Sequence, residues 1–134
     1  MLPVIILLAS AAMTAPVALT STSEFELSRN PETMGAYVRE YFADQPIMAE
    51  IAKCESRFRH LAPNGDIIRG KVNKSDIGVM QINTYYHEEA ADELGIDLYS
   101  LDGNLEYARY LHEREGTKPW NSSRPCWGKY ATAK

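Results

Sequence analysis

The sequence has few of the residues that build metal centres. Among 134 residues there are only two cysteines and three histidines, and two thiols are too few for a structural zinc site. His87-Glu88 begins like the His-Glu-x-x-His motif of zinc proteases, but Ala91 stands where the second histidine belongs. The sequence therefore predicts neither a metal site nor a cofactor, and His87 is expected to face solvent.

Basic residues are outnumbered by acidic ones. The chain has 14 Lys and Arg against 18 Asp and Glu, a formal net charge of −4, and it has no basic stripe interleaved with aromatic residues. This balance does not favour a nucleic-acid partner. The length suits one domain and is too short for two of ordinary size, and we expect a monomer.

Only one long apolar run occurs. Residues 2–19 are almost wholly apolar or small, which fits a secretory signal or a short membrane anchor. No Lys or Arg precedes the run, and Pro16 disfavours cleavage after Ala15. We expect export to the cell envelope or the exterior, with residues 1–22 as a cleaved signal peptide or an N-terminal anchor.

Export bears on the two cysteines, Cys54 and Cys126, which lie far apart in the sequence. In an oxidising compartment a disulfide is their simplest use. A nucleophilic cysteine would need a nearby base. The sequence therefore favours one long-range disulfide.

A linker and then two helices are expected after the apolar run. Residues 20–28 are rich in Ser and Thr with scattered acids, so a linker is placed at 23–29. Asn30 and Pro31 form a helix start, and Pro46 ends that helix and suits the first turn of the next. Apolar residues recur at helical spacing in both: Met34, Tyr37, Val38, Tyr41 and Phe42 in the first, and Ile47, Met48, Ile51 and Ala52 in the second.

Glu55 is the candidate catalytic acid. It continues the Ile47–Ile51 row of the second helix, so its side chain is directed at the edge of an apolar face. It also lies near the helix C-terminus, where the macrodipole disfavours negative charge. Both effects raise the pKa of a carboxyl, and a carboxyl that stays protonated near neutral pH can protonate a glycosidic oxygen. The alternative is a surface glutamate paired with Arg57 or Arg59.

Helical periodicity is lost between residues 58 and 77. Pro-Asn-Gly-Asp at 63–66 is a turn signal, so a small hairpin or an irregular loop is expected to form one lip of a cleft. Gly-Val-Met-Gln-Ile-Asn at 78–83 is expected to follow as a short helical turn. Its amides, Gln81 and Asn83, could reach sugar hydroxyls and N-acetyl groups.

Two more helices are predicted towards the C-terminus. Thr84 is a plausible N-cap for the first, which Gly95 stops. The second starts near Asp102 and stops at Gly116, and Asn104 falls beside its apolar stripe, which predicts a buried amide. The stripe consists of Leu101, Leu105, Ala108 and Leu111.

Two features of the C-terminal region remain. Tyr110 is expected either to pack in the core or to contact substrate. Residues 119–127 are expected to be irregular, and the disulfide is expected to tie them beneath the helix that carries Glu55.

Three short blocks occur in a fixed order: Cys-Glu-Ser-Arg-Phe at 54–58, Gly-Val-Met-Gln-Ile-Asn at 78–83, and Asn-Leu-Glu-Tyr-Ala-Arg-Tyr-Leu at 104–111. In order and spacing they resemble the SLT-type lytic transglycosylases, of the lysozyme-like superfamily that includes goose-type lysozymes. The resemblance implies a mainly α, lysozyme-like domain over residues 30–130 that acts on peptidoglycan.

The resemblance also implies roles for single residues. Glu55 would be the sole acid/base that cuts the β-1,4 bond between N-acetylmuramic acid and N-acetylglucosamine. The same glutamate would then help the muramoyl C6 hydroxyl attack the anomeric carbon, leaving a 1,6-anhydro product without a second carboxylate. Ser56 and Gln81 match positions that line the site, with Ser56 positioning Glu55.

One block departs from the family pattern. SLT-type enzymes usually carry an Ala-Tyr-Asn block whose tyrosine sits near the catalytic glutamate, whereas residues 120–127 read Trp-Asn-Ser-Ser-Arg-Pro-Cys-Trp. The missing tyrosine weakens the prediction of a transglycosylase product more than it weakens the prediction of glycan cleavage.

Two alternatives stay open. Asp76 could lie across the cleft and activate water, because hydrolysis by inversion needs a second carboxylate roughly 6.5–9.5 Å from the acid. Alternatively, Asp76 is a cap or an ion-pair partner of Lys74. The chain could also be a non-catalytic peptidoglycan-binding module of the envelope.

Overall fold

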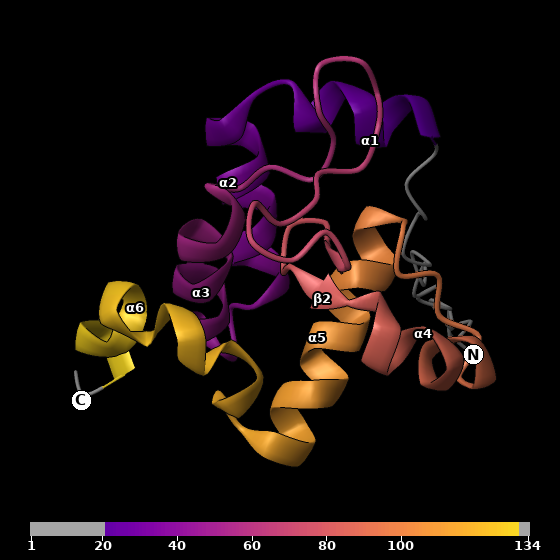
Figure 1. Ribbon diagram of the computed structural model, residues 1–134. Coiled ribbons are helices and arrows are strands. Elements are labelled where there is room, and N and C mark those ends of the chain that lie inside the picture. Colours follow the sequence, from indigo (N-terminus) through magenta and orange to yellow (C-terminus); the bar gives the residue numbers. More distant parts are fainter. Residues whose placement is uncertain (1–20, 132–134) are drawn as a thin grey trace, which may run out of the picture.

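The structure is a computed structural model that describes residues 21–131, and it is mainly helical, as predicted (Figure 1). The expected leader, residues 1–22, therefore falls almost entirely outside the described residues. Within them, no helix is both long and apolar enough to cross a membrane. In chain order the elements are α1 (Ser21–Ser28), α2 (Pro31–Tyr41), α3 (Pro46–Ser56), β1 (Asp76–Ile77), β2 (Ile82–Asn83), α4 (Thr84–Glu93), α5 (Leu101–Glu115), the 3-10 helix η1 (Lys118–Ser123) and α6 (Arg124–Ala131).

Helix α1 stands where the linker at 23–29 was expected, so that prediction is wrong. The helix packs against α2, and Leu27 lies against the core. The carboxylate of Glu24 also lies 3.3 Å from Nε2 of His60, which is fully buried. These contacts come from distant parts of the chain, and the local Ser-rich composition does not reveal them.

The predicted starts of the next two helices are confirmed. The Asn30 side chain accepts from two main-chain N–H groups at the start of α2, and Pro31 occupies its first turn. Pro46 does the same for α3. Helix α3 ends sharply, because Arg57 and Phe58 both have left-handed backbone angles, with φ of 55° and 58°.

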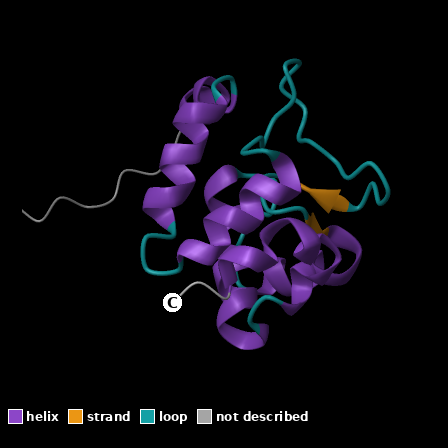
Figure 2. Ribbon diagram, turned by 90° about the vertical axis from the view of Figure 1, so that its left-hand side faces the viewer, coloured by secondary structure: helices purple, strands orange, loops and turns teal. Residues whose placement is uncertain are grey.

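The loop after α3 leads into a small hairpin (Figure 2). Bridges pair Leu61 with Ile67 and Arg69 with Ile77, and β1 pairs antiparallel with β2. Residues 78–81 are the turn of this hairpin and not the helical turn that was expected. Its first and last residues, Gly78 and Gln81, have φ of 74° and 52°, which no right-handed helix accommodates.

The two later helices form nearly as predicted. Asn83 caps α4 by accepting from the Tyr86 N–H, one residue earlier than the cap expected at Thr84. Ser100 caps α5, and Gly116 ends it. All four residues of the predicted α5 stripe are buried, so this helix forms the centre of the core.

The C-terminal segment is helical rather than irregular. Trp120 and Trp127 are 2% and 1% exposed, and their burial orders η1 and α6. The predicted disulfide is confirmed, since Cys54 and Cys126 are bonded across a sequence separation of 72. It joins α6 to α3, and Figure 1 shows the two helices side by side.

Candidate active site

A cavity of about 310 Å³ brings together residues from α3, the hairpin, α4, α5 and η1. Its volume lies at the lower end of the range of ligand sites in proteins. The residues that argue for a function are Glu55, Asp76, Gln81, Asn83, Tyr86 and His87. Lys and Arg are absent from the described residues that line it, and its two carboxyl groups belong to Glu55 and Asp76.

Two roomier hollows lie elsewhere and lack comparable chemistry. One, of about 460 Å³, lies beside α1, and the residues that line it include no carboxylate. The other, of about 500 Å³, has Glu50 in its wall, but that carboxylate is paired with Arg39 at 2.7 Å. We therefore place the candidate site in the smaller cavity.

Glu55 is the next-to-last residue of α3 and is half-buried in the cavity wall. Burial is the largest influence and raises the pKa of its carboxyl; the nearby charge of Asp76 raises the pKa further, while a hydrogen bond from Ser123 opposes the shift. The surface ion pair considered above does not form with either arginine in the described chain. Instead, Nε of Arg59 donates to the main-chain oxygen of Ser56.

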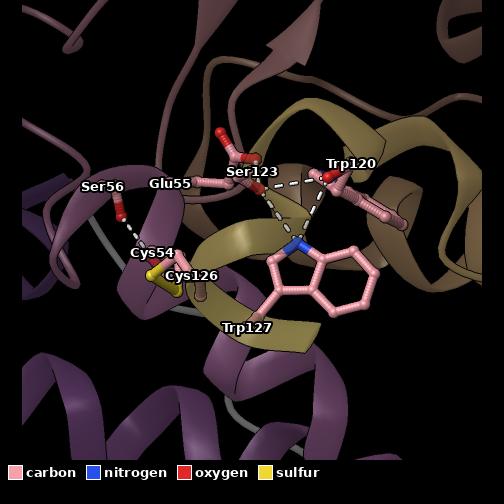
Figure 3. The surroundings of a disulfide bond; sticks show 8 residues. Cys54, Glu55, Ser56, Trp120, Ser123, Cys126 and Trp127 are labelled. Carbon is pink, nitrogen blue, oxygen red and sulfur yellow. Dashed lines mark hydrogen bonds between the residues drawn. A yellow bond between two sulfur atoms is a disulfide. The ribbon is translucent and has the colours of Figure 1, made fainter. Parts of the chain in front are cut away.

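Ser123 is a site residue that the sequence reasoning missed. Its Oγ lies 2.5 Å from Oε1 of Glu55 and 3.1 Å from the main-chain oxygen of Trp120. The indole N–H of Trp127 donates to the same Oγ at 3.0 Å (Figure 3). The predicted disulfide could have revealed it. Cys54 precedes Glu55, so its bond to Cys126 also brings the residues near Cys126, including Ser123, close to Glu55.

The hairpin turn that faces Glu55 is held by buried side chains. The N–H of Val79 donates to Nδ1 of His60 at 3.2 Å. The N–H of Met80 donates to Oδ1 of Asn104 at 2.9 Å, and Nε1 of Trp120 donates to the oxygen of Met80 at 2.9 Å. The predicted buried amide at Asn104 is thus confirmed, and it anchors the cavity wall.

Replacement of Gly78 by alanine should destabilise this wall. The residue has φ of 74°, and an added Cβ would lie 2.5 Å from Nδ2 of Asn104 and 2.8 Å from Cε1 of His60. We expect a loss of about 2–4 kcal/mol in the free energy of unfolding, from left-handed strain together with overpacking. Urea titration would measure it.

Gly95→Ala is the matched control for this substitution. Gly95 has φ of 72° with no atom within 4 Å of an added Cβ, so only the backbone strain applies, about 1–2 kcal/mol. Equal losses in the two variants would show that the contacts around Gly78 do not matter.

Gln81 and Asn83 line the cavity, as expected for substrate-binding residues, but both amides are already engaged. Nε2 of Gln81 donates to the oxygen of Gly78 at 2.9 Å. Nδ2 of Asn83 donates to Oδ1 of Asp76 at 2.9 Å, while its Oδ1 caps α4. These bonds fix the orientation of both side chains at the cavity.

Ser56 and Tyr110 are not among the residues that line the cavity. Ser56 is buried; its hydroxyl donates to the oxygen of Ala52 and accepts from the N–H of Arg59, so it shapes the end of α3. Tyr110 packs on Tyr107, with ring centroids 5.4 Å apart. Of the two expectations for Tyr110, the structure shows core packing.

Asp76 and His87 both line the cavity. Lys74 forms no ion pair with Asp76 within residues 21–131, and the Asp76 carboxylate accepts from Asn83 instead. His87 does not face open solvent, so that expectation is wrong. It is half-buried, its Nδ1 lies 3.0 Å from the hydroxyl of Tyr107, and burial lowers its pKa, which keeps the ring neutral at pH 7.

The described residues contain no group of three or more His, Cys, Asp or Glu that could hold a metal ion. Comparison of the chain with protein-family models, with curated proteins and with solved structures finds no match.

Proposed function

We propose that this chain cleaves peptidoglycan glycan strands, with Glu55 as the general acid. One observation carries the proposal: a half-buried carboxyl with a raised pKa opens into a cavity lined by amides, hydroxyls, aromatic rings and a second carboxylate. The raised pKa favours the protonated carboxyl, which is the form that can protonate a glycosidic oxygen. The amides and hydroxyls of the cavity can form hydrogen bonds with the hydroxyl groups of a saccharide.

The arrangement of the three sequence blocks supports a lysozyme-like fold for the domain. Glu55 of the first block and Gln81 of the second line one cavity, and Asn104 of the third anchors the turn that carries Gln81. Three segments, two from separate helices and one from the hairpin, thus contribute to one site. This convergence supports the resemblance to SLT-type lytic transglycosylases.

The proposed reaction has two steps. Glu55 gives its proton to the oxygen of the β-1,4 bond as the bond between that oxygen and the muramoyl anomeric carbon breaks. The muramoyl C6 hydroxyl oxygen then bonds to that carbon and its proton passes to the Glu55 carboxylate, which restores the acid. The second product is a 1,6-anhydro sugar, and no water is consumed.

Export is part of the proposal, because peptidoglycan lies outside the cytoplasmic membrane. We propose that residues 1–22 direct the chain there, as a cleaved signal or an anchor. The disulfide between Cys54 and Cys126 supports an oxidising compartment. We further propose that the enzyme acts as a monomer.

A muramidase that uses water is the second candidate function. It is favoured by Asp76, which lines the same cavity as Glu55 and raises the pKa of Glu55 through its charge. In this reaction Asp76 would take a proton from water as the water oxygen bonds to the anomeric carbon. The product would then have a reducing end.

Mass spectrometry of the fragments released from purified peptidoglycan tests the proposal. We expect anhydromuropeptides, each lighter by one water than the hydrolysis product. Asp76→Asn should leave anhydro products in place, because the substrate's own hydroxyl is the nucleophile. Reducing-end products that disappear in Asp76→Asn would identify the hydrolase instead.

A folded wild-type protein that releases no fragment would overturn the enzymatic proposal. Binding of that protein to insoluble peptidoglycan, measured by co-sedimentation, would then support the non-catalytic envelope module.

A further inference from the structure

We propose that Ser123 is a positioning residue whose hydroxyl exchanges its hydrogen bond between Glu55 and the main-chain oxygen of Trp120, so that Glu55 can act first as an acid and then as a base. This inference rests on the proposed function. It concerns how one carboxyl serves both steps of the reaction.

The exchange follows from a count of protons. A serine hydroxyl has one proton to donate and two lone pairs with which to accept. Two acceptors lie within its reach, Oε1 of Glu55 at 2.5 Å and the oxygen of Trp120 at 3.1 Å. One proton cannot serve both, so the charge of Glu55 decides which acceptor is used.

When Glu55 is ionised, the Ser123 hydroxyl donates to its carboxylate, a charge-assisted hydrogen bond. When Glu55 is protonated, its own O–H donates to Oγ of Ser123, and the serine proton turns to the oxygen of Trp120. In both states the indole N–H of Trp127 donates to Oγ or to the oxygen of Trp120, at 3.0 and 3.2 Å. No polar group loses its partner when the proton moves.

The frame around the hydroxyl is rigid. Trp120 and Trp127 are almost fully buried, and the nearby disulfide fastens α6 to the residue before Glu55 (Figure 3). Only the hydroxyl proton has to rotate, while Oγ stays in place. Such a fixed partner avoids reorganisation during the reaction.

Few other charges face Glu55. Asp76, Tyr86 and His87 are the other titratable residues that line the cavity; α5 and η1 contribute only Leu111, Pro119, Trp120 and Ser122. On α6, the guanidinium of Arg124 lies over the Trp127 ring at 6.0 Å. Among the neighbours of Glu55, only Ser123 lowers its pKa, through its hydrogen bond. Removal of that hydrogen bond should therefore raise the pKa of Glu55.

Ser123→Ala tests the exchange through the pH profile of fragment release. We expect kcat at neutral pH to fall about 10- to 100-fold, the range for loss of a hydrogen bond to a charged group. The whole profile should also move to higher pH. Ser123→Thr keeps a hydroxyl and should restore both. Asn121→Ala, an exposed position on the same 3-10 helix, is the matched control.

A measurement on the wild-type protein keeps the inference falsifiable if Ser123→Ala does not fold. The chain has only two tryptophans. The indole proton NMR signal of Trp127 should titrate with the Glu55 carboxyl and stop titrating in Glu55→Gln. The Trp120 indole, which donates to Met80, should not follow it and serves as the internal control.

The outcomes separate this inference from the proposed function. A Trp127 signal that ignores the titration of Glu55, or a Ser123→Ala profile that loses rate without moving in pH, would overturn the exchange while fragment release still supports the enzyme. Coupled titration in a protein that releases no fragment would support the exchange and overturn the proposed function.

Discussion

Glu55→Gln should lower the rate of fragment release from peptidoglycan by about 10²- to 10⁴-fold, the usual contribution of a general acid. Glutamine has nearly the same shape but no proton that a glycosidic oxygen can take. Its carbonyl oxygen can still accept the hydrogen bond of Ser123, so folding should be retained. Quantified release of soluble muropeptides measures the rate, and circular dichroism checks the fold.

The same substitution should change the dependence of stability on pH. Because burial raises the pKa of Glu55 above its ordinary value of 4.5, the folded chain holds this proton at pH values where the unfolded chain has released it. The wild type therefore loses stability as pH rises from about 4.5 through the folded-state pKa. Glu55→Gln has no such loss. Its Tm should therefore exceed that of the wild type most clearly near neutral pH, and the difference should disappear in acid.

Glu50→Gln is the control for both measurements. Glu50 lies on the same helix, but its carboxylate is paired with Arg39 and it is not part of the cavity lining. We expect wild-type release rates from it. Unchanged release from Glu55→Gln itself would remove Glu55 from its proposed role.

Loss of the disulfide should have the largest effect on stability. Replacing Cys54 and Cys126 by serine opens a bridge that spans 72 residues, which should cost about 4–5 kcal/mol on the chain-entropy model. Unfolding in urea, followed by tryptophan fluorescence, measures the loss. Because the bridge joins α6 to α3, the double variant should also release fragments more slowly.

Reduced wild-type protein separates the bridge from its side chains. Treatment with a dithiol should reproduce the stability of the double serine variant. A loss below about 1 kcal/mol in both samples would contradict the role assigned to the bridge. Mass measurement before and after reduction verifies that the bond was present.

Local signals in the sequence determined much of the scaffold. Asn30, Pro31 and Pro46 place two helix starts through capping and backbone restriction, effects that act within one turn. The α5 stripe follows from helical spacing alone. The position of Glu55 at the end of an apolar helix could also be read in this way, whereas the disulfide followed from the number of cysteines and the expected oxidising compartment.

Tertiary contacts decided the rest. Helix α1 packs against α2, and its Glu24 contacts the distant His60. The hairpin turn adopts positive φ at Gly78 and Gln81 because buried side chains hold it there.

The partner of the acid is the clearest case. Ser123 is 68 residues from Glu55, and no local pattern marks it. The sequence alone identified Glu55 as the residue that can carry the proton, because helical spacing places its side chain at the edge of an apolar face. Only the folded chain decided what surrounds that proton, because a hydrogen bond between distant segments exists once burial and the disulfide have brought them together.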